Sequence, residues 1–514
     1  MLALLASHSP CGISGEIVSV EVDIRRGIPG IDIVGLPDGA VREARERVRV
    51  AIKNSGFVMP AQRILVSLAP AGIRKGGAVY DLPIALGVLA ASGQIPMRNT
   101  PVAMVLGELN LSGQVRSVSG TLAAVTSGIT NGIDRYLVPR ENLAEARALG
   151  EGSVVGISSL KEAAKLVCRP AGPSSDVEAG SAEAEGADTS ELGDFADIKG
   201  HDQLKRAMEI AAAGRHHVLL FGPPGSGKTM AARRLPTILP PLSREESLVV
   251  TSIHSVAGVL PGGRSLIRRP PFRSPHHSAS SEGITGGGRV PRPGEVSLAH
   301  AGILFLDEAP EFKKTLLQTL REPVEEGRIT ISRAGLTLHF PSDFQLVLAA
   351  NPCPCGNLGR DAAVCGCTSQ EVQRYWRRLG GALLDRIDIR VPLVPVSAAR
   401  MGTPGGQSSF QMKCRVERAV AIQRRRYRGL SFSRNARIPP GLVERYVPLD
   451  NAGRSMLTDS LARLCLSSRA YHSILKIARS IADLSESERV SAEHVLEASQ
   501  HRRYGDDDVF WSYG

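Results

Sequence analysis

Residues 222–229, GPPGSGKT, have the residue types and spacing of a phosphate-binding loop. They follow the apolar run VLLF and match the pattern G-x-x-x-x-G-K-[ST], so a chance glycine loop is the weaker reading. Glycines let such a loop turn its backbone N–H groups toward phosphates, and the helix that follows adds partial positive charge. Lys228 is expected to reach the outer phosphates and the Thr229 hydroxyl to ligate Mg²⁺. The expected nucleotide contacts are Gly222, Pro223, Pro224, Gly225, Ser226, Gly227, Lys228 and Thr229.

Asp307 and Glu308 supply the acids that nucleotide hydrolysis requires. They follow four apolar residues in GILFLDEAPEF. Asp307 is predicted to hold Mg²⁺ through water and Glu308 to polarise the attacking water. Such a pair is weak evidence alone, and the upstream loop makes it strong. The third apolar strand, FQLVLAAN, ends in Asn351, which is predicted to orient the water; the alternative is an Asn that only terminates a strand.

Two arginines complete the predicted hydrolytic set. Arg386, in LLDRIDIRV, follows a helical stretch from which it can reach the nucleotide of a neighbouring subunit. Such a finger accelerates hydrolysis by about 10³–10⁵-fold in well-studied enzymes. Arg469, in LSSRAYHSIL, begins a predicted helix and is expected to touch the γ-phosphate within its own chain. The competing candidates are Arg377, Arg378, Arg390 and Arg479.

Four cysteines lie in one short segment, NPCPCGNLGRDAAVCGCTS. Cys353 and Cys355 form one C-x-C pair, and Cys365 and Cys367 form a second. Four thiolates among Pro and Gly turns can close a tetrahedral site, for which Zn²⁺ is the default metal. Buried or redox-active thiols are the alternative. Because the segment starts two residues after Asn351, we expect a structural Zn²⁺ to pin a loop beside the nucleotide.

Basic loops suggest a polyanionic partner. Residues 255–295 are rich in Gly, Pro and basic residues, including Arg268, Arg269 and Arg273. Residues 327–340 predict a β-hairpin that turns near residues 334–335 and exposes Arg328 and Arg333. These five arginines are the DNA-binding candidates, because hairpins at this chain position can line a pore and grip phosphates. Solvated loops between subunits are the alternative, and residues 424–438 are a further basic candidate.

The first of three predicted segments, residues 1–168, alternates strand and helix patterns. Apolar residues alternate with polar ones, as in a half-buried strand, at Val18, Val20, Val22 and Ile24. One face of a predicted helix carries Val41, Ala44, Val48, Ala51 and Ile52. Further strands are predicted at residues 63–68, 102–107 and 135–139, and further helices at 82–91 and 160–167. These patterns predict a small α/β domain.

Residues 169–196 are rich in Gly, Ala, Ser and acids, so they predict a flexible acidic linker that cannot bury enough apolar surface to fold. Residues 197–396 carry the nucleotide and cysteine motifs. In residues 397–514 helical periodicity predicts a helical lid, with apolar positions at Met456, Leu457, Leu461, Leu464 and Cys465, and at Ile474, Ile477, Ala478 and Ile481.

Bulk composition narrows the class of protein. At 514 residues the chain is too long for one core, and its formal charge of +11 suits a phosphate-bearing partner without proving one. No apolar run approaches the roughly 20 residues that cross a bilayer, and the N-terminus lacks the basic start of a signal peptide. Eight cysteines, half of them in one cluster, indicate a reducing compartment. The expected location is the cytoplasm, with no membrane partner.

The chain resembles the ComM/YifB family of magnesium-chelatase-like AAA+ proteins. The resemblance rests on GPPGSGKT, PFRSPHHSASS, GGGRVPRPGEVSLAHAGILFLDE, REPVEEGRITISRAG, ANPCPCG, LLDRIDI and SSRAYHSILKIARSIADL. It covers nearly the whole chain, residues 22–49 included, but not the acidic linker. It implies a Lon-protease-like (ribosomal S5 domain 2-like) N-terminal α/β domain, an AAA+ P-loop core and a C-terminal helical lid. The roles given above to Lys228, Asp307, Glu308, Asn351, Arg386 and Arg469 carry over at these positions.

The same resemblance implies ATP with Mg²⁺ as cofactors and a homo-hexameric ring. It also implies helicase-like DNA branch migration in homologous recombination and natural transformation, on single-stranded or branched DNA. A Lon-type protease needs a Ser nucleophile and a Lys. The corresponding stretches, residues 72–91 and 119–128, lack the Ser and the Lys respectively, so proteolysis is not expected. A chelatase-type motor acting on a protein partner and an ATP-dependent protein remodeller remain the alternatives.

Overall fold

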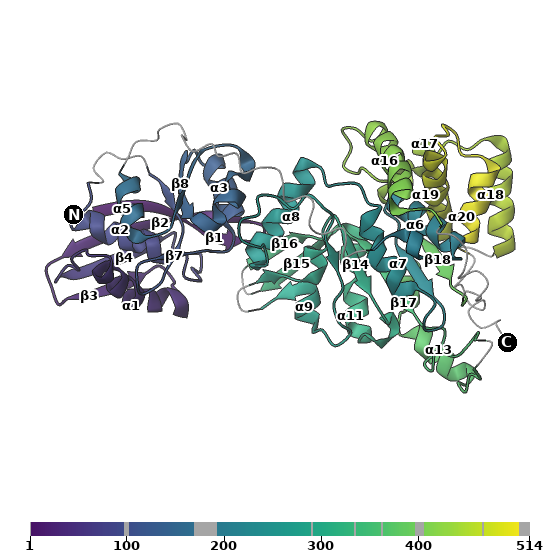
Figure 1. Cartoon of the computed structure of the whole chain (residues 1–514), viewed down its shortest axis with the longest axis horizontal. Coiled ribbons are helices and arrows are strands. Elements are labelled where there is room, and N and C mark those ends of the chain that lie inside the picture. The colour runs from purple at the N-terminus through teal and green to yellow at the C-terminus, as the bar shows by residue number, and fades with distance from the viewer. Residues whose placement is uncertain are drawn as a thin grey trace.

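The computed structural model describes residues 2–96, 102–168, 193–288, 291–333, 336–360, 363–395, 406–464 and 467–502. Along this elongated chain an N-terminal α/β unit, a central unit built on a parallel sheet, and a group of C-terminal helices follow one another (Figure 1). Most of the predicted linker, residues 169–192, lies outside the described residues. Phe195 is already fully buried, so ordered packing begins before the predicted boundary at residue 197.

The N-terminal unit is a seven-stranded mixed sheet with the strand order β3-β4-β2-β1-β5-β8-β9. β1 and β2 form a long antiparallel hairpin, β2 also pairs antiparallel with β4, and the remaining neighbours are parallel. The strands are β1 (Leu2–Cys11), β2 (Ser14–Arg25), β3 (Gly30–Val34), β4 (Arg63–Ala69), β5 (Met104–Val105), β8 (Arg135–Pro139) and β9 (Ser153–Ile157). The helices are α1 (Gly39–Asn54), α2 (Asp81–Ala91), α3 (Thr121–Thr130), α4 (Leu143–Ala146) and α5 (Leu160–Val167).

The predicted patterns of this unit are confirmed with one exception. In α1 the five residues predicted to share a face, from Val41 to Ile52, are the buried ones. The strand predicted at residues 102–107 was too long, because only Met104 and Val105 pair with neighbouring strands. Gly107 already turns away to bond the carbonyl of Val79.

The central unit is a five-stranded, wholly parallel sheet with the order β11-β14-β17-β10-β18. Its strands are β10 (Val218–Phe221), β11 (Phe272–Arg273), β14 (Ile303–Leu306), β17 (Gln345–Ala350) and β18 (Ile389–Pro392). β10, β14 and β17 are buried along their whole length, as expected for parallel strands covered on both faces. The sheet therefore explains the unbroken apolar runs in front of the phosphate-binding loop, the acids and Asn351.

Helices surround this sheet and shorter elements fill its connections. The helices are α6 (Asp202–Gly214), α7 (Lys228–Arg234), α8 (Arg244–Ala257), α9 (Ser281–Thr285), α10 (Glu295–Leu298), α11 (Lys314–Thr319), α12 (Arg321–Glu326), α13 (Ser369–Arg377) and α14 (Gly381–Leu384). The predicted hairpin is present as β15 (Arg328–Arg333) and β16 (Leu336–Pro341). Two other small ribbons are β6 (Glu108–Leu109) with β7 (Val115–Arg116), and β12 (Gly286–Gly287) with β13 (Arg292–Pro293).

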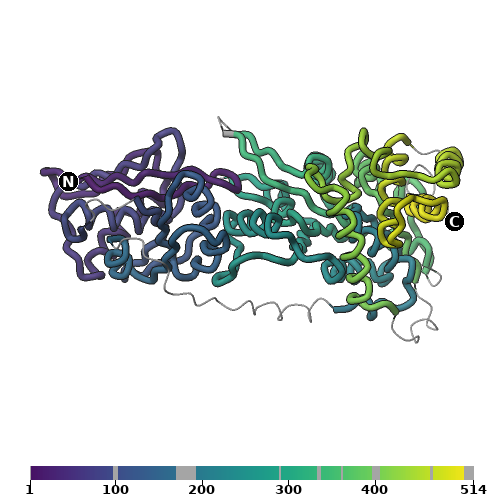
Figure 2. The backbone as a smooth tube through the Cα atoms, turned by 90° about the horizontal axis from the view of Figure 1, so that it is seen from above, coloured from purple at the N-terminus to yellow at the C-terminus, as the bar shows by residue number. Residues whose placement is uncertain are grey.

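The C-terminal helices pack on one end of the central unit (Figure 2). They are α16 (Ser409–Arg426), α17 (Val443–Tyr446), α18 (Asn451–Leu464), α19 (Ser468–Leu484) and α20 (Ala492–Gln500). Ile474, Ile477 and Ile481 of α19 share a hydrophobic core with Val218 and Leu220 of β10. The predicted helices are present as α18 and α19, although Cys465 and the side chain of Leu464 lie outside the described residues. Among the described residues no helix is both long and apolar enough to cross a bilayer.

Candidate nucleotide and metal sites

The carboxyl ends of three central strands bring the predicted nucleotide residues together. Thr229, at the start of α7, donates its hydroxyl proton to Asp307 Oδ2 at 2.8 Å. Lys228 Nζ donates to Asn351 Oδ1 at 3.2 Å. Asp307 follows β14 and lies 78 positions after Thr229, and Asn351 follows β17 and lies 123 positions after Lys228. Both therefore meet the phosphate-binding loop at one edge of the sheet.

The phosphate-binding loop is shaped by backbone constraints. A Cβ atom at Gly222 would lie 2.2 Å from the carbonyl oxygen of Leu393, so only glycine fits beside β18. Gly227 has a φ of 87°, in the left-handed region that favours glycine, and it directly precedes α7. The loop can therefore lie close against the sheet and still present the amino-terminal end of a helix.

The Lys228 ammonium is folded back onto its own loop. Besides Asn351, it donates to the carbonyl oxygens of Gly222 at 2.6 Å and Pro223 at 2.9 Å. The residue is 8% exposed, and this burial lowers the pKa of Lys228 to about 8. A phosphate group placed here would favour the charged amine and give it a stronger partner than a carbonyl. The residues present thus fit a nucleoside triphosphate, and the Thr229 and Asp307 oxygens are of the type that Mg²⁺ prefers.

Glu308 adopts a backbone conformation that is rare for a non-glycine residue, with φ 49° and ψ 46°. Such strain concentrates at functional sites. Its side chain is 55% exposed, and Oε2 lies 3.9 Å from Nδ1 of His277. The neighbouring His276 packs against His277 with ring centroids 4.1 Å apart. The sequence places both histidines in a basic loop but does not predict this approach to Glu308; the only local signal is their adjacency in SPHHSAS.

The two predicted arginines meet each other at one carboxylate. Arg386 pairs with Glu325 at 2.6 Å and is 13% exposed, and it also bonds the carbonyl of Ala382. Arg469, at the start of α19, pairs with the same Glu325 oxygen. Hydrogen bonds from Arg386 and then from Arg469 lower the pKa of Glu325.

Three of the four competing arginines have other partners. Arg390 is 1% exposed and bonds the carbonyl of Leu384. Arg479 is equally buried and pairs with Asp483 on its own helix. Arg378 is exposed and donates to Glu311 Oε2 at 3.1 Å. Their burial and these partners give Arg390 and Arg479 structural positions.

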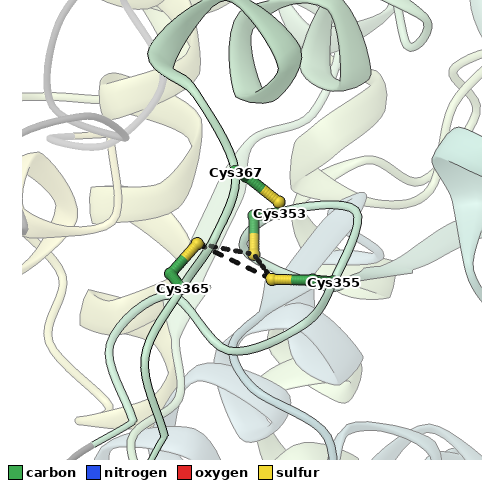
Figure 3. Close-up of side chains that lie close together, drawn as sticks. All are labelled: Cys353, Cys355, Cys365 and Cys367. Carbon is green, nitrogen blue, oxygen red and sulfur yellow. Dashed lines mark hydrogen bonds between the residues drawn. The ribbon is translucent and has the colours of Figure 1, made fainter.

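The four clustered cysteines come together around one point (Figure 3). All four Sγ atoms lie within 4.8 Å of one another, and Cys353 Sγ is 3.3 Å from Cys355 Sγ and 3.6 Å from Cys365 Sγ. A tetrahedral Zn²⁺ with Zn–S bonds of about 2.3 Å places its sulfurs about 3.8 Å apart. The side chains present therefore fit a four-cysteine metal site, although the geometry does not identify the metal.

The cysteine segment adjoins the phosphate-binding loop. A Cβ atom at Gly356, between the two C-x-C pairs, would lie 2.9 Å from Pro224 Cγ. On its far side the segment leads into α13, which begins with a capping box of Thr368 and Glu371. Trp376 of that helix donates its indole proton to the Pro352 carbonyl at 3.1 Å. A metal at the cysteines can thus order the wall of the nucleotide site.

The five candidate DNA contacts differ in exposure. Arg268 and Arg269 are exposed in the loop after α8. Arg273 is half-buried and pairs with both oxygens of Glu295, at 2.6 and 2.7 Å, so its guanidinium already has a structural partner. Arg328 is exposed and pairs with Glu326 at 3.2 Å. Arg333 ends β15, and its side chain lies outside the described residues.

In the N-terminal unit, the two stretches compared with the Lon protease line one cavity of about 230 Å³. Gly76, Gly77 and Ala78 of the first stretch face Ser119 and Gly120 of the second. Two segments that are distant in the chain are thus joined in one pocket, which His8, Leu106 and Glu108 also line.

Comparison with family models matches three parts of the chain. Residues 194–401 match the model described as magnesium chelatase, subunit ChlI. Residues 20–142 match subunit ChlI of Mg-chelatase, and residues 406–502 match its C-terminal part.

Curated relatives extend this similarity over nearly the full length. The chain is 41% identical over 509 residues to YifB of Salmonella typhimurium, covering 98% of this chain and 97% of the relative. It is 38% identical over 504 residues to the competence protein ComM of Haemophilus influenzae, with the same coverage. It is also 29% identical over 187 residues to the magnesium-chelatase 38 kDa subunit of Rhodobacter capsulatus, covering 33% of this chain and 53% of that one.

Proposed function

We propose that this chain, which belongs to the magnesium-chelatase-like family that includes YifB and ComM, is an ATP-driven motor that moves along DNA. In this proposal it acts as a homo-hexameric ring on single-stranded or branched DNA, as a ComM-like helicase that promotes branch migration in homologous recombination and natural transformation. Family membership supports an ATPase of the chelatase type. The DNA substrate and the ring are the proposed steps beyond it.

The observation that carries the proposal is the meeting of Lys228, Thr229, Asp307 and Asn351 at one sheet edge, joined by hydrogen bonds of 2.8 and 3.2 Å. Lys228 would leave the loop carbonyls to bind the outer phosphates. Thr229 and Asp307 would hold Mg²⁺, which supplies charge neutralisation at the phosphates when bound.

Hydrolysis then depends on groups that place and deprotonate a water molecule. Glu308, exposed at the same edge, would accept the proton of the attacking water, and Asn351 would orient that water toward the γ-phosphate. Arg469 would contact the γ-phosphate in its own chain. Arg386 would reach the nucleotide of the next subunit, which requires it to leave Glu325 when the ring forms.

Three features support DNA as the substrate. The net charge is +11, the loop after α8 exposes Arg268 and Arg269, and the β15–β16 hairpin carries Arg328 and Arg333. Polycations of this kind bind phosphate backbones without sequence preference. Arg273 contributes least to this proposal, because Glu295 neutralises it.

A chelatase-type motor that acts on a protein partner is the second candidate, supported by the similarity to the magnesium-chelatase 38 kDa subunit. That similarity covers one third of this chain. The similarity to YifB and ComM instead covers 98% of this chain. We therefore place DNA first.

The deciding experiment is ATP turnover by the purified full chain with and without single-stranded DNA, across a salt titration. We expect DNA to raise turnover and log affinity to fall by about 0.7 per phosphate contacted for each log unit of salt. Arg268→Gln with Arg269→Gln should reduce the salt slope, whereas Arg63→Gln, at an exposed pair with Asp32 on the N-terminal sheet, should not. The DNA proposal would be refuted if, at low salt, no polynucleotide bound to the chain and none changed its ATP turnover.

A further inference from the structure

The cavity of about 230 Å³ in the N-terminal unit lies apart from the nucleotide residues. Its walls come from the end of β1, the loop before α2, the segment after β5 and the loop before α3. A cavity of about 150 Å³ can hold benzene, so this one has room for a single pyrimidine or purine ring. The cavity therefore has the size of a site for one small ring.

Hydrogen bonds from residues outside the cavity hold one of its walls in place. Asn142 is 8% exposed, and its side chain accepts from the Val118 amide and donates to the Val118 carbonyl, both at 3.0 Å. Ser255 of α8 accepts from the Gly120 amide at 3.0 Å through its hydroxyl oxygen. The loop before α3 is thus fixed at two points. A wall that is already ordered loses little entropy when a ligand binds, which favours affinity.

Most polar groups of the lining are neutral. Ser117 and Ser119 supply exposed hydroxyls, and His8 supplies an imidazole that is 2% exposed. Burial lowers the pKa of His8 to about 4, so the ring is neutral, with one donor and one acceptor nitrogen. No described residue bonds its Nε2. A buried ring nitrogen without a partner is uncommon in a native protein.

Glu108 carries the only charge among the described residues that line the cavity. Its carboxylate pairs with exposed Arg116 at 3.7 Å, a weak pair that a better donor can replace. Without a cation in its lining the cavity disfavours phosphate, whereas the carboxylate can accept from the amino group of cytosine. Val79, Leu106 and Val118 add apolar surface that suits the face of a ring. The lining therefore favours a flat, neutral ring with an amino group on its edge.

The basic loop after α8, proposed above to face DNA, is attached to the N-terminal unit beside this cavity. The Gly263 amide donates to the Glu141 carbonyl at 3.1 Å, one residue before the Asn142 side chain that braces the wall. Arg140 and Arg264, both exposed, are the sequence neighbours of the two bonded residues. Figure 1 shows α8 beside α3 and β1. Two basic side chains are thus placed next to a wall of the cavity.

The β15–β16 hairpin, the second element proposed to face DNA, approaches the same region from β1. A Cβ atom on Gly12, in the β1–β2 turn, would lie 3.5 Å from the His339 carbonyl oxygen of β16. Pro10, two residues earlier, lines the cavity, and its Cγ would lie 3.4 Å from a Cβ atom on Gly120 of the opposite wall. The cavity therefore lies between the attachments of both proposed DNA-facing elements.

We propose that this cavity holds one unstacked nucleobase of a single DNA strand, and that Glu108 gives preference to a base with an amino group, such as cytosine. The inference rests on the proposed action on DNA and adds a base-binding site to the phosphate contacts of the basic loop. Arg140 and Arg264 are placed to contact the phosphates on either side of the held base. A base held out of the stack cannot re-pair, so the site would keep separated strands apart while the motor advances.

Strand affinity of the full chain, measured with oligo(dC), oligo(dT) and an abasic strand of equal length, tests the site. The wild type should bind oligo(dC) about five- to tenfold more tightly than oligo(dT), and the abasic strand most weakly, because it presents no base. Glu108→Gln should remove the preference for oligo(dC) and leave the slope of log affinity against log salt unchanged, since no phosphate contact is lost. The matched control is Glu43→Gln, an exposed acid on α1 that pairs with Arg47, which should keep the preference.

Ser119→Phe fills the cavity from an exposed position and provides a second variant if Glu108→Gln does not fold. It should lower the affinity for oligo(dC) to that for the abasic strand. Thr130→Phe, which adds the same ring at the exposed end of α3, should not. Free deoxycytidine should compete only at much higher concentration, because it has no flanking phosphates. If deoxycytidine binds the wild type but not Ser119→Phe, while the three strands bind alike, the ligand is a free nucleoside and the strand-base proposal is overturned.

The remaining outcomes separate this inference from the proposed function. Equal affinity of the wild type for all three strands overturns the base site and leaves the motor, which needs only phosphate contacts. A wild type that binds no strand at low salt overturns both. A base preference that Ser119→Phe removes, in a chain whose ATP turnover ignores DNA, keeps the base site and removes the motor. Unfolded casein that binds the wild type but not Ser119→Phe, with strand binding equal in the two, would assign the cavity to a polypeptide and overturn the base site.

Discussion

Each of the two large sheets positions a buried lysine beside glycines, yet the two lysines have different surroundings. Lys228 of the central unit is 8% exposed and Lys75 of the N-terminal unit is fully buried. Lys228 bonds two loop carbonyls and Asn351, with Asp307 and Glu308 near enough to favour its charge. Lys75 Nζ bonds the carbonyl of Pro70, and burial lowers its pKa.

The difference follows from sheet topology. In the all-parallel central sheet the carboxyl ends of β10, β14 and β17 share one edge, so the residues that follow each strand converge there. In the mixed N-terminal sheet the long antiparallel hairpin of β1 and β2 places successive strand ends at opposite edges. The same residue type can therefore serve ligand binding in one unit and loop packing in the other.

Replacing each lysine with Met tests most directly whether only Lys228 serves nucleotide hydrolysis. Lys228→Met should lower ATP turnover by at least about 10²–10³-fold, because a donor to the developing phosphate charge is lost. Lys75→Met should leave turnover within about twofold and cost roughly 1–3 kcal/mol of stability, since the Pro70 carbonyl loses its buried partner. Steady-state turnover and urea unfolding of both variants provide the measurements. Equal loss of turnover in the two variants would contradict the assignment.

Two glutamates extend the comparison. Glu308→Gln should retain nucleotide binding and assembly while turnover falls about 10²–10⁴-fold, as when a general base is removed. Glu145, buried in the N-terminal unit, accepts from the Leu122 amide at 2.8 Å and from Asn142, and burial raises its pKa. Glu145→Gln should change stability but not turnover. Normal hydrolysis by Glu308→Gln, measured beside nucleotide affinity, removes Glu308 as the base.

Sequence patterns predicted the parts of this molecule that depend on local periodicity and short spacing. The buried face of α1, the apolar strands in front of the acids, and the closeness of the four cysteines all follow from such patterns. The partners of Arg386 and Arg469 could not be predicted in this way. Glu325 lies 144 residues from Arg469, and only tertiary packing of α12 against the C-terminal helices brings them together. The approach of His277 to Glu308 has the same origin.

We expect the smallest effect on turnover from the cysteine cluster, which belongs to the central unit alone. Removing the metal by chelation, or by Cys355→Ser, should lower the unfolding temperature of the central unit by about 2–4 °C per kcal/mol lost and reduce turnover modestly, because Gly356 packs on Pro224. The matched control, Cys168→Ser at the end of α5, should retain metal and turnover. Elemental analysis measures the bound metal, and visible spectra after Co²⁺ substitution show whether thiolates ligate it. The opposite result would be a purified chain that carries no metal and whose unfolding temperature changes neither with chelator nor with Cys355→Ser. It would show that the four thiols pack without an ion. The wall of the nucleotide site would then be ordered by α13 and Trp376 instead.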